Sequence, residues 1–290
     1  MKRGARLPGT PNPMHTWNGA DGLRIAGDSW GDPDDPLVVL LHGGGQTRHA
    51  WGGTGELLGA SGYCAVAFDA RGHGDSDWSP EGDYSQDAFV RDLRCLLDAL
   101  DATCPILIGA SLGGGTSLVS VGENHVDARA VVLVDIVPNT EPAGVERIRS
   151  FMGQKPDGFA SLEEVADAIS AYQPQRRRPD TLDGLAKNVR LGDDGVYRWH
   201  WDPGFLAYPR DLGARRQRFS ASARKLSVPT LLVRGGSSDV VSEEGVREFL
   251  DLCSHAEYVN VAQAGHMVAG DRNDIFGRAT IGFLGRHAQA

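Results

Sequence analysis

The chain has 290 residues, a hydrophobic fraction of 41% and a formal net charge of −9 at pH 7. This acidic balance argues against a surface for nucleic-acid phosphates, because such a surface needs clustered Lys and Arg. No apolar run approaches the ~18 residues of a membrane span, and prolines interrupt the region where a signal peptide would be apolar. We therefore expect a cytoplasmic protein with neither a nucleic-acid nor a membrane partner.

Short apolar runs followed by glycine-rich turns recur along the chain and predict buried strands. A weaker signal from His15 to Trp30, around an Asn18–Gly22 turn, predicts an antiparallel edge hairpin. The expected buried strands are Pro36–Leu41, Cys64–Phe68, Pro105–Ile108, Ala130–Val134, Pro229–Val233 and Glu257–Val261.

Helical periodicity follows several of these strands. Residues 86–100 place apolar side chains at helical spacing with Asp and Arg on the other face, and 244–252 and 273–287 predict two later helices. Strands that alternate with helices indicate a mostly parallel sheet covered by helices. We expect residues 1–137 and 227–290 to form this core.

Residues 138–226 interrupt the alternation. This stretch is rich in Pro, Arg and Asp, has no obvious core strand and carries short helical patterns such as Leu162–Tyr172. An insertion of this length at the ligand-binding end of a sheet is more typical of a lid than of a loop, so we expect a helical cap. The aromatic cluster in this stretch either lines a substrate pocket or packs the cap on the body. The candidate pocket residues are four of this cluster and one glycine of an early loop: Trp199, His200, Trp201, Tyr208 and Gly45.

The strongest motif is G-x-S-x-G at residues 109–113, directly after the apolar run Ile106–Ile108 and before a stretch compatible with a helix. In this context the central Ser111 lies on a sharp elbow, and small residues two positions away let strand and helix approach. We interpret Ser111 as a nucleophile.

A serine hydroxyl is a weak nucleophile at neutral pH and needs a histidine as base. Among the nine histidines, His266 follows the last expected strand in a glycine-rich loop. It also closes the chain order serine, acid, histidine. We therefore expect His266 to be the general base.

Two aspartates are candidates for the acid that orients this histidine. Asp239 follows the strand Pro229–Val233 through a flexible turn, and Asp135 directly follows the strand Ala130–Val134. On chain order and turn geometry we favour Asp239. Asp135 remains as its substitute or as a supporting residue.

Acyl transfer also needs N–H donors for the oxyanion. The residue after the nucleophile, Leu112, supplies one backbone donor. The glycines after His42 supply the other, for which we choose Gly44, with Gly45 as an alternative.

Together these motifs look like the α/β-hydrolase superfamily. The resemblance implies an eight-stranded, mostly parallel sheet with one antiparallel strand, a cap before the later strands and no cofactor. It also implies that His42 and the Arg71–Ser76 loop brace the oxyanion loop. The motifs that carry it are His42-Gly43-Gly44-Gly45, Asp69-Ala70-Arg71-Gly72-His73-Gly74-Asp75-Ser76, Gly109-Ala110-Ser111-Leu112-Gly113-Gly114, the Asp239 turn and Gly265-His266.

The flanking residues Gln46–Trp51 resemble the group with epoxide hydrolases, dehalogenases, carbon–carbon bond hydrolases, enol-lactonases and cofactor-free haloperoxidases. Epoxide hydrolases and dehalogenases of that group attack with aspartate, so Ser111 indicates attack on a carbonyl. We expect a carboxylic ester hydrolase acting on an ester or lactone of a small to medium apolar substrate. The alternatives are a cofactor-free haloperoxidase or perhydrolase, a carbon–carbon bond hydrolase using Arg190, Arg198 or His200, and a catalytically silent binding protein.

The four cysteines are scattered, without paired C-x-x-C spacing. This pattern favours reduced thiols over a disulfide framework or a metal site. We expect neither a metal nor an organic cofactor, and the sequence leaves the oligomeric state open.

Overall fold

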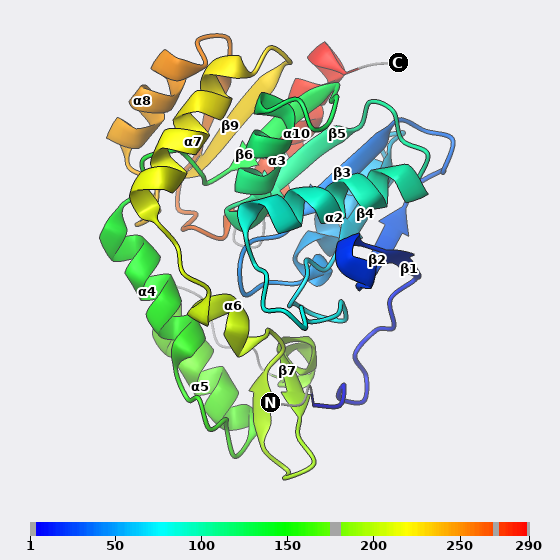
Figure 1. Ribbon diagram of the computed structural model, residues 1–290, viewed down its shortest axis with the longest axis vertical. Coiled ribbons are helices and arrows are strands. Elements are labelled where there is room, and N and C mark those ends of the chain that lie inside the picture. Colours follow the sequence, from blue (N-terminus) through cyan, green and yellow to red (C-terminus); the bar gives the residue numbers. More distant parts are fainter. Residues whose placement is uncertain (1–3, 175–180, 269–272, 289–290) are drawn as a thin grey trace.

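A computed structural model describes residues 4–174, 181–268 and 273–288, and its centre is an eight-stranded sheet (Figure 1). The strand order is β1-β2-β4-β3-β5-β6-β9-β10. Strand β2 is antiparallel to both of its neighbours, and the pairs from β4 to β10 are parallel. The strands are β1 (His15–Asn18), β2 (Arg24–Trp30), β3 (Leu37–Leu41), β4 (Cys64–Phe68), β5 (Ile106–Ala110), β6 (Ala130–Val134), β9 (Thr230–Gly235) and β10 (Glu257–Val261).

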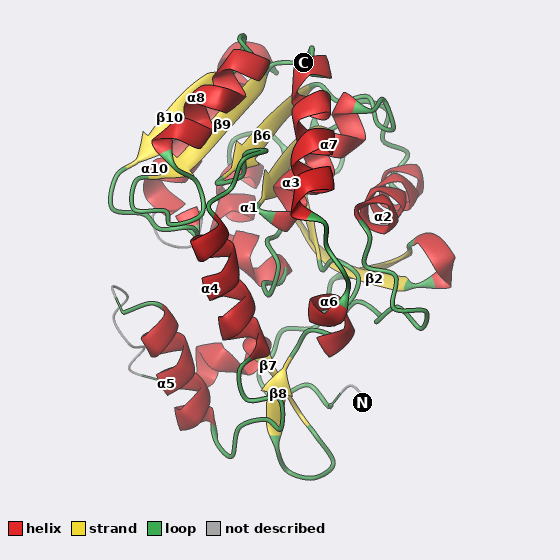
Figure 2. Cartoon of the chain, turned by 60° about the vertical axis from the view of Figure 1, so that its left-hand side comes forward, coloured by secondary structure: helices red, strands yellow, loops and turns green. Residues whose placement is uncertain are grey.

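Helices cover both faces of this sheet (Figures 1 and 2). One face packs against α2 (Gln86–Ala99), α3 (Leu112–Gly122), α7 (Leu212–Lys225) and α8 (Glu243–Leu252). The other face packs against α1 (Gly52–Gly59) and α10 (Asn273–His287). Because both faces are covered, a central strand such as β6 is buried at every residue, which explains its continuous apolar sequence.

The segment between β6 and β9 forms most of a second layer at one end of the sheet. Its elements are α4 (Pro142–Gly153), α5 (Leu162–Tyr172), the 3₁₀ helix Asp183–Asn188, β7 (Val189–Leu191), β8 (Tyr197–Trp199) and α6 (Pro203–Ala207), which we call the cap. Buried apolar residues of this segment, among them Phe159, Val165 and Trp199, form one cluster with residues of the body such as Tyr84 and Phe89. Figure 2 shows the cap below the body that carries the sheet.

The fold class is confirmed, and the expected strands lie within two residues of the observed ones. One expectation about residues 138–226 is corrected. The cap carries helices as expected and, in addition, an antiparallel hairpin of β7 and β8. The last helix, α7, packs on the sheet through Phe219 and Ala223 and therefore belongs with the body.

Within the described residues, no helix combines the length and apolar character needed to cross a bilayer.

Candidate active site

Ser111 lies at the sharp turn between β5 and α3. Its backbone has φ 46° and ψ −105°, a strained conformation for a residue with a side chain. The two flanking glycines of the motif are required by close packing: a Cβ on Gly109 would lie 2.4 Å from the carbonyl oxygen of Gly113, and one on Gly113 would lie 2.3 Å from that of Leu41. The turn thus presents Ser111 at the carboxyl end of the sheet, as the motif predicts.

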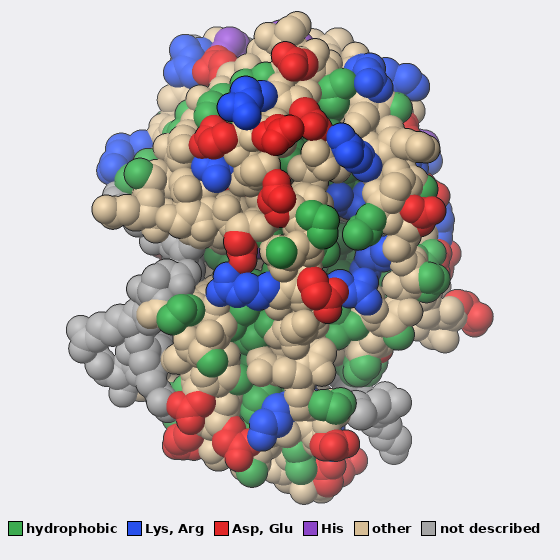
Figure 3. Space-filling model, turned by 90° about the vertical axis from the view of Figure 1, so that its left-hand side faces the viewer, with side chains coloured by type: hydrophobic (Ala, Val, Ile, Leu, Met, Phe, Trp, Pro, Cys, Tyr) green, Lys and Arg blue, Asp and Glu red, His purple; other side chains and the backbone are tan. Residues whose placement is uncertain are grey.

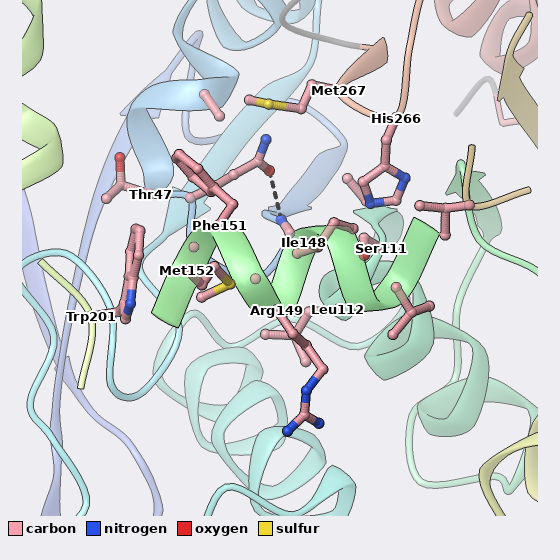
Figure 4. Close-up of a pocket in the computed structure, with 18 of the residues that line it drawn as sticks. Thr47, Ser111, Leu112, Ile148, Arg149, Phe151, Met152, Trp201, His266 and Met267 are labelled. Atoms are coloured by element: carbon pink, nitrogen blue, oxygen red, sulfur yellow. Dashed lines mark hydrogen bonds between the residues drawn. The ribbon is translucent and has the colours of Figure 1, made fainter. Parts of the chain in front are cut away.

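His266 lies in the loop after β10, and its imidazole turns toward Ser111 (Figure 4). Its Nδ1 is 2.6 Å from Oδ2 of Asp135. An ionised carboxylate only accepts hydrogen bonds, so Nδ1 carries the proton and Nε2 is left with its lone pair. This is the tautomer that can accept a proton from a hydroxyl.

Asp135 is completely buried at the end of β6, with φ 49°. Besides the bond from His266, its carboxylate accepts the backbone N–H of Gly235 at Oδ1 (2.9 Å) and the hydroxyl of Ser238 at Oδ2 (2.5 Å). These bonds fix the orientation of the carboxylate. The sequence analysis did not anticipate the role of Ser238.

The expected preference for Asp239 is corrected by this geometry. Asp239 points to the surface, where its side chain is 41% exposed and pairs with Arg147 of α4 at 2.6 Å. Arg147 also donates to the backbone carbonyl of Tyr172 at the end of α5 (2.5 Å). Asp239 therefore links the loop after β9 to the cap, and the alternative acid, Asp135, is the one that contacts His266.

The loop after β3 carries the expected oxyanion donors. The N–H of Gly43 is already used, because it donates to Oε1 of Gln46 at 2.8 Å, and the N–H of Gly45 donates to His73. Within the described residues no hydrogen bond is found for the N–H of Gly44 or of Leu112, and both residues line the same pocket as Ser111. These two N–H groups are therefore available to a ligand.

Three buried imidazoles brace this loop. His42 Nδ1 donates to the carbonyl of Gly43 (2.8 Å), His73 Nε2 accepts from the N–H of Gly45 (3.1 Å), and His200 Nε2 donates to the Gly45 carbonyl (3.3 Å). Burial lowers the pKa of all three, that of His73 to about 3, so they are neutral at pH 7. The expected bracing by His42 agrees with this arrangement.

His200 was expected in the pocket wall, and so was Tyr208. Neither is among the residues that line the pocket. The ring of His200 is almost fully buried, and its Nδ1 accepts the N–H of Gly74. It therefore joins the cap to the body.

The arginines considered for a substrate carboxylate are also engaged elsewhere. Arg190 is buried and pairs with Asp75 at 3.0 Å, where Arg48 contacts the other carboxylate oxygen at 2.9 Å. Arg198 pairs with Asp194 at the surface (2.6 Å). Neither guanidinium lines the pocket.

The pocket lies between body and cap and has a volume of about 490 Å³. Gly45, Trp199 and Trp201, three of the expected pocket residues, line it. Phe151 and Met152 of α4 add apolar surface (Figure 4). The cavity can hold a medium-sized, largely apolar molecule next to Ser111.

No group of three or more metal-ligating side chains occurs in the described part of the chain. All four cysteines are free.

Residues 36–272 match the profile of the alpha/beta hydrolase fold family, and the chain belongs to this family. Among its relatives, Esterase Rv0045c of Mycobacterium tuberculosis is 28% identical over 94% of this chain and 90% of its own length. A crystal structure of that esterase superposes with a TM-score of 0.74 at 27% identity, covering 95% of this chain and 93% of the other. The 3-hydroxybutyrate-oligomer hydrolase of Cupriavidus necator is 28% identical over 84% of this chain and 87% of its own.

Proposed function

We propose that the protein is a serine hydrolase that cleaves a carboxylic ester or lactone through an acyl-enzyme. The observation that carries this proposal is the elbow serine, Ser111, in one pocket with a histidine whose Nδ1 proton is held by buried Asp135. The similarity to an esterase and to an oligomer hydrolase supports the same class of reaction.

In the first half-reaction, Nε2 of His266 accepts the proton of Ser111 as its Oγ attacks the substrate carbonyl. The negative charge that develops on the carbonyl oxygen is held by the N–H groups of Gly44 and Leu112. Asp135 stabilises the imidazolium by charge. The imidazolium then gives its proton to the leaving alkoxide as the bond from the carbonyl carbon to the leaving oxygen breaks.

In the second half-reaction, water replaces the alcohol. His266 removes one proton from the water as its oxygen attacks the acyl carbon. The ester bond to Ser111 then breaks, and the proton returns to Oγ. The products are the carboxylic acid and the free enzyme, so no cofactor is needed for the balance.

The test is steady-state hydrolysis of p-nitrophenyl esters from acetate to octanoate, with γ- and δ-lactones alongside. We expect turnover that Ser111→Ala abolishes and that Ser150→Ala, a change of an exposed serine on α4, leaves unaltered. Turnover that survives Ser111→Ala would overturn the proposal. Absence of turnover despite covalent labelling of Ser111 would favour the carbon–carbon bond hydrolase.

A further inference from the structure

The charge of the pocket is opposite to the charge of the chain. The protein carries a net charge of −9, yet no Asp or Glu occurs among the described residues that line the pocket. The same lining contains Arg149, Lys187, Arg210 and Arg215. An accumulation of cations in the cavity that holds Ser111 favours an anionic ligand there.

The three arginines converge from two elements. Arg149 lies on α4 of the cap, Arg210 lies two residues before α7, and Arg215 is the fourth residue of α7. In Figure 4 the side chain of Arg149 leaves α4 in a direction away from His266. Arg149 therefore points away from the histidine that acts on Ser111.

None of the three arginines forms an ion pair with a described carboxylate. The guanidinium of Arg210 lies over the ring of Phe205 at 4.4 Å and donates to the Phe205 carbonyl, and that of Arg215 lies over the ring of Phe219 at 4.2 Å. Aromatic faces hold these cations in place without neutralising them.

The fully buried arginines of this protein are neutralised: Arg48 contacts three aspartates, and Arg71 forms a two-bond pair with Asp92. Arg210 and Arg215 are partly exposed and Arg149 is exposed, so water reaches their guanidinium groups. They are therefore accessible to an anionic group of a ligand.

The positive charges of the three arginines also repel one another. Burial, and then the charge of Arg210, lowers the pKa of Arg215 to about 10, and burial followed by the charge of Arg149 lowers the pKa of Arg210. Both remain charged at pH 7, so the repulsion persists in the free protein. A bound anion would relieve it.

Helix stability does not account for Arg215. A cation in the first turn of a helix faces the positive end of the helix dipole, which is unfavourable. The basic residues that suit the dipole of α7 are Arg224 and Lys225 in its last turn. Asp211 already caps this end of α7 through the N–H of Ala214, so the side chain of Arg215 itself is the group that favours an anion there.

Figure 3 looks onto the side of the molecule where body and cap meet, and Lys and Arg side chains lie there near a hollow with Asp and Glu side chains among them. A guanidinium group matches the two oxygens of a carboxylate or a phosphate. Much of the remaining lining is apolar and includes Phe151 and Met152.

We infer that the pocket takes an amphiphilic ester: an apolar body with a terminal anionic oxygen group, a carboxylate or a phosphate, bound by Arg149, Arg210 and Arg215. This inference rests on the proposed function, which identifies the ester bond as the bond that is cleaved. The anionic end is held by the arginine cluster while the ester carbonyl lies at Ser111. It refines the expectation of a purely apolar substrate.

The first experiment compares mono-p-nitrophenyl adipate, which carries a carboxylate, with its neutral methyl ester. We expect the wild type to favour the anionic ester by about tenfold or more in kcat/KM, the size of a charge-assisted hydrogen bond. Arg215→Gln and Arg210→Gln should each lose most of this preference, measured as the ratio of kcat/KM for the anionic ester to kcat/KM for the neutral ester. Arg216→Gln is the matched control, because Arg216 is on the same helix, pairs with Glu248 and does not line the pocket.

Two further measurements do not depend on how well these variants fold. In the wild type, raising the salt concentration should reduce the preference for the anionic ester and leave the neutral ester almost unaffected. A p-nitrophenyl ester bearing a terminal phosphate, tested beside the adipate, separates a phosphate site from a carboxylate site. A thermal melt of each variant identifies any that is unfolded.

Binding of monomethyl and dimethyl adipate to Ser111→Ala, measured by calorimetry, separates this inference from the proposed function. If Ser111→Ala binds the monoester selectively but the wild type hydrolyses no ester, the anion site is supported and the hydrolase proposal is overturned. Serine-dependent turnover of both esters at equal rates, with no selective binding and no effect of Arg215→Gln, would overturn the anion site alone.

Discussion

Asparagine in place of Asp135 tests the assignment of the acid. Oδ1 of Asp135 accepts the N–H of Gly235, and that backbone donor cannot reverse its direction. In the Asp135→Asn variant the amide oxygen must therefore take the Oδ1 position, which leaves the NH₂ group facing Nδ1 of His266. His266 must then place its own proton on Nε2, the atom that has to accept the proton of Ser111.

The expected cost of Asp135→Asn is a fall in kcat of about 10⁴-fold, the size known for the same change in serine proteases. That factor corresponds to about 5 kcal/mol in the activation free energy. Asp239→Asn is the matched comparison. Its carboxylate is 41% exposed and its ion pair with Arg147 contributes at most about 1 kcal/mol, so kcat/KM should change by less than about fivefold.

The assay is steady-state hydrolysis of p-nitrophenyl butyrate, with a thermal melt of each variant to confirm that it is folded. A loss of less than about tenfold in Asp135→Asn together with a large loss in Asp239→Asn would refute the reasoning. That result would restore Asp239 as the acid.

Three other predictions concern the braces, the elbow and the cap. His73→Gln should make the free energy of unfolding less dependent on pH. The pKa of His73 is about 3 in the folded protein, so His73 takes up a proton only on unfolding at mildly acidic pH. The wild type therefore loses stability as the pH drops below ~6.5, by about 2 kcal/mol at pH 5 from this residue. Urea unfolding at pH 7 and pH 5 measures this, with exposed His15→Gln as the control, and identical curves for His73→Gln and the wild type would contradict it. Gly113→Ala should lower the unfolding free energy by roughly 1–3 kcal/mol or more, because its Cβ would lie 2.3 Å from the carbonyl oxygen of Leu41; an unchanged thermal melt would count against the close packing at the elbow. Arg147→Ala, which removes the link between the body and the cap, should raise KM by up to about fivefold and leave kcat nearly constant, and a fall in kcat alone would show that the link has another role.

The strands and the elbow could be predicted from sequence because their signals are local. A buried parallel strand such as β6 is apolar throughout, and the glycines of the Ser111 motif are required by the packing of β5 on α3. His266 was also found, since its loop follows the last strand. These features depend on short stretches of chain.

The acid could not be chosen in the same way. Asp135 and Asp239 follow neighbouring strands, β6 and β9, so both are near the histidine by topology. The choice depends on the positive φ of Asp135 and on the donors Gly235 and Ser238, which come from another part of the chain. The one local signal was that Asp135 follows its strand without an intervening turn.

The arginine cluster and the true place of His200 were hidden for the same reason. Arg149 and Arg215 are far apart in sequence and meet only because α4 and α7 border one pocket. His200 contacts Gly45 and Gly74 across more than a hundred residues. Contacts between cap and body are set by tertiary packing, which composition and periodicity do not encode.

The central claim is that Ser111 is the activated nucleophile, and covalent labelling by a fluorophosphonate tests it most directly. Intact-mass measurement should show one adduct, peptide mapping should place it on Ser111, and Ser111→Ala should remain unlabelled. Labelling should be much slower in Asp135→Asn than in Asp239→Asn. An adduct on another residue, or none on the folded wild type, would contradict the account.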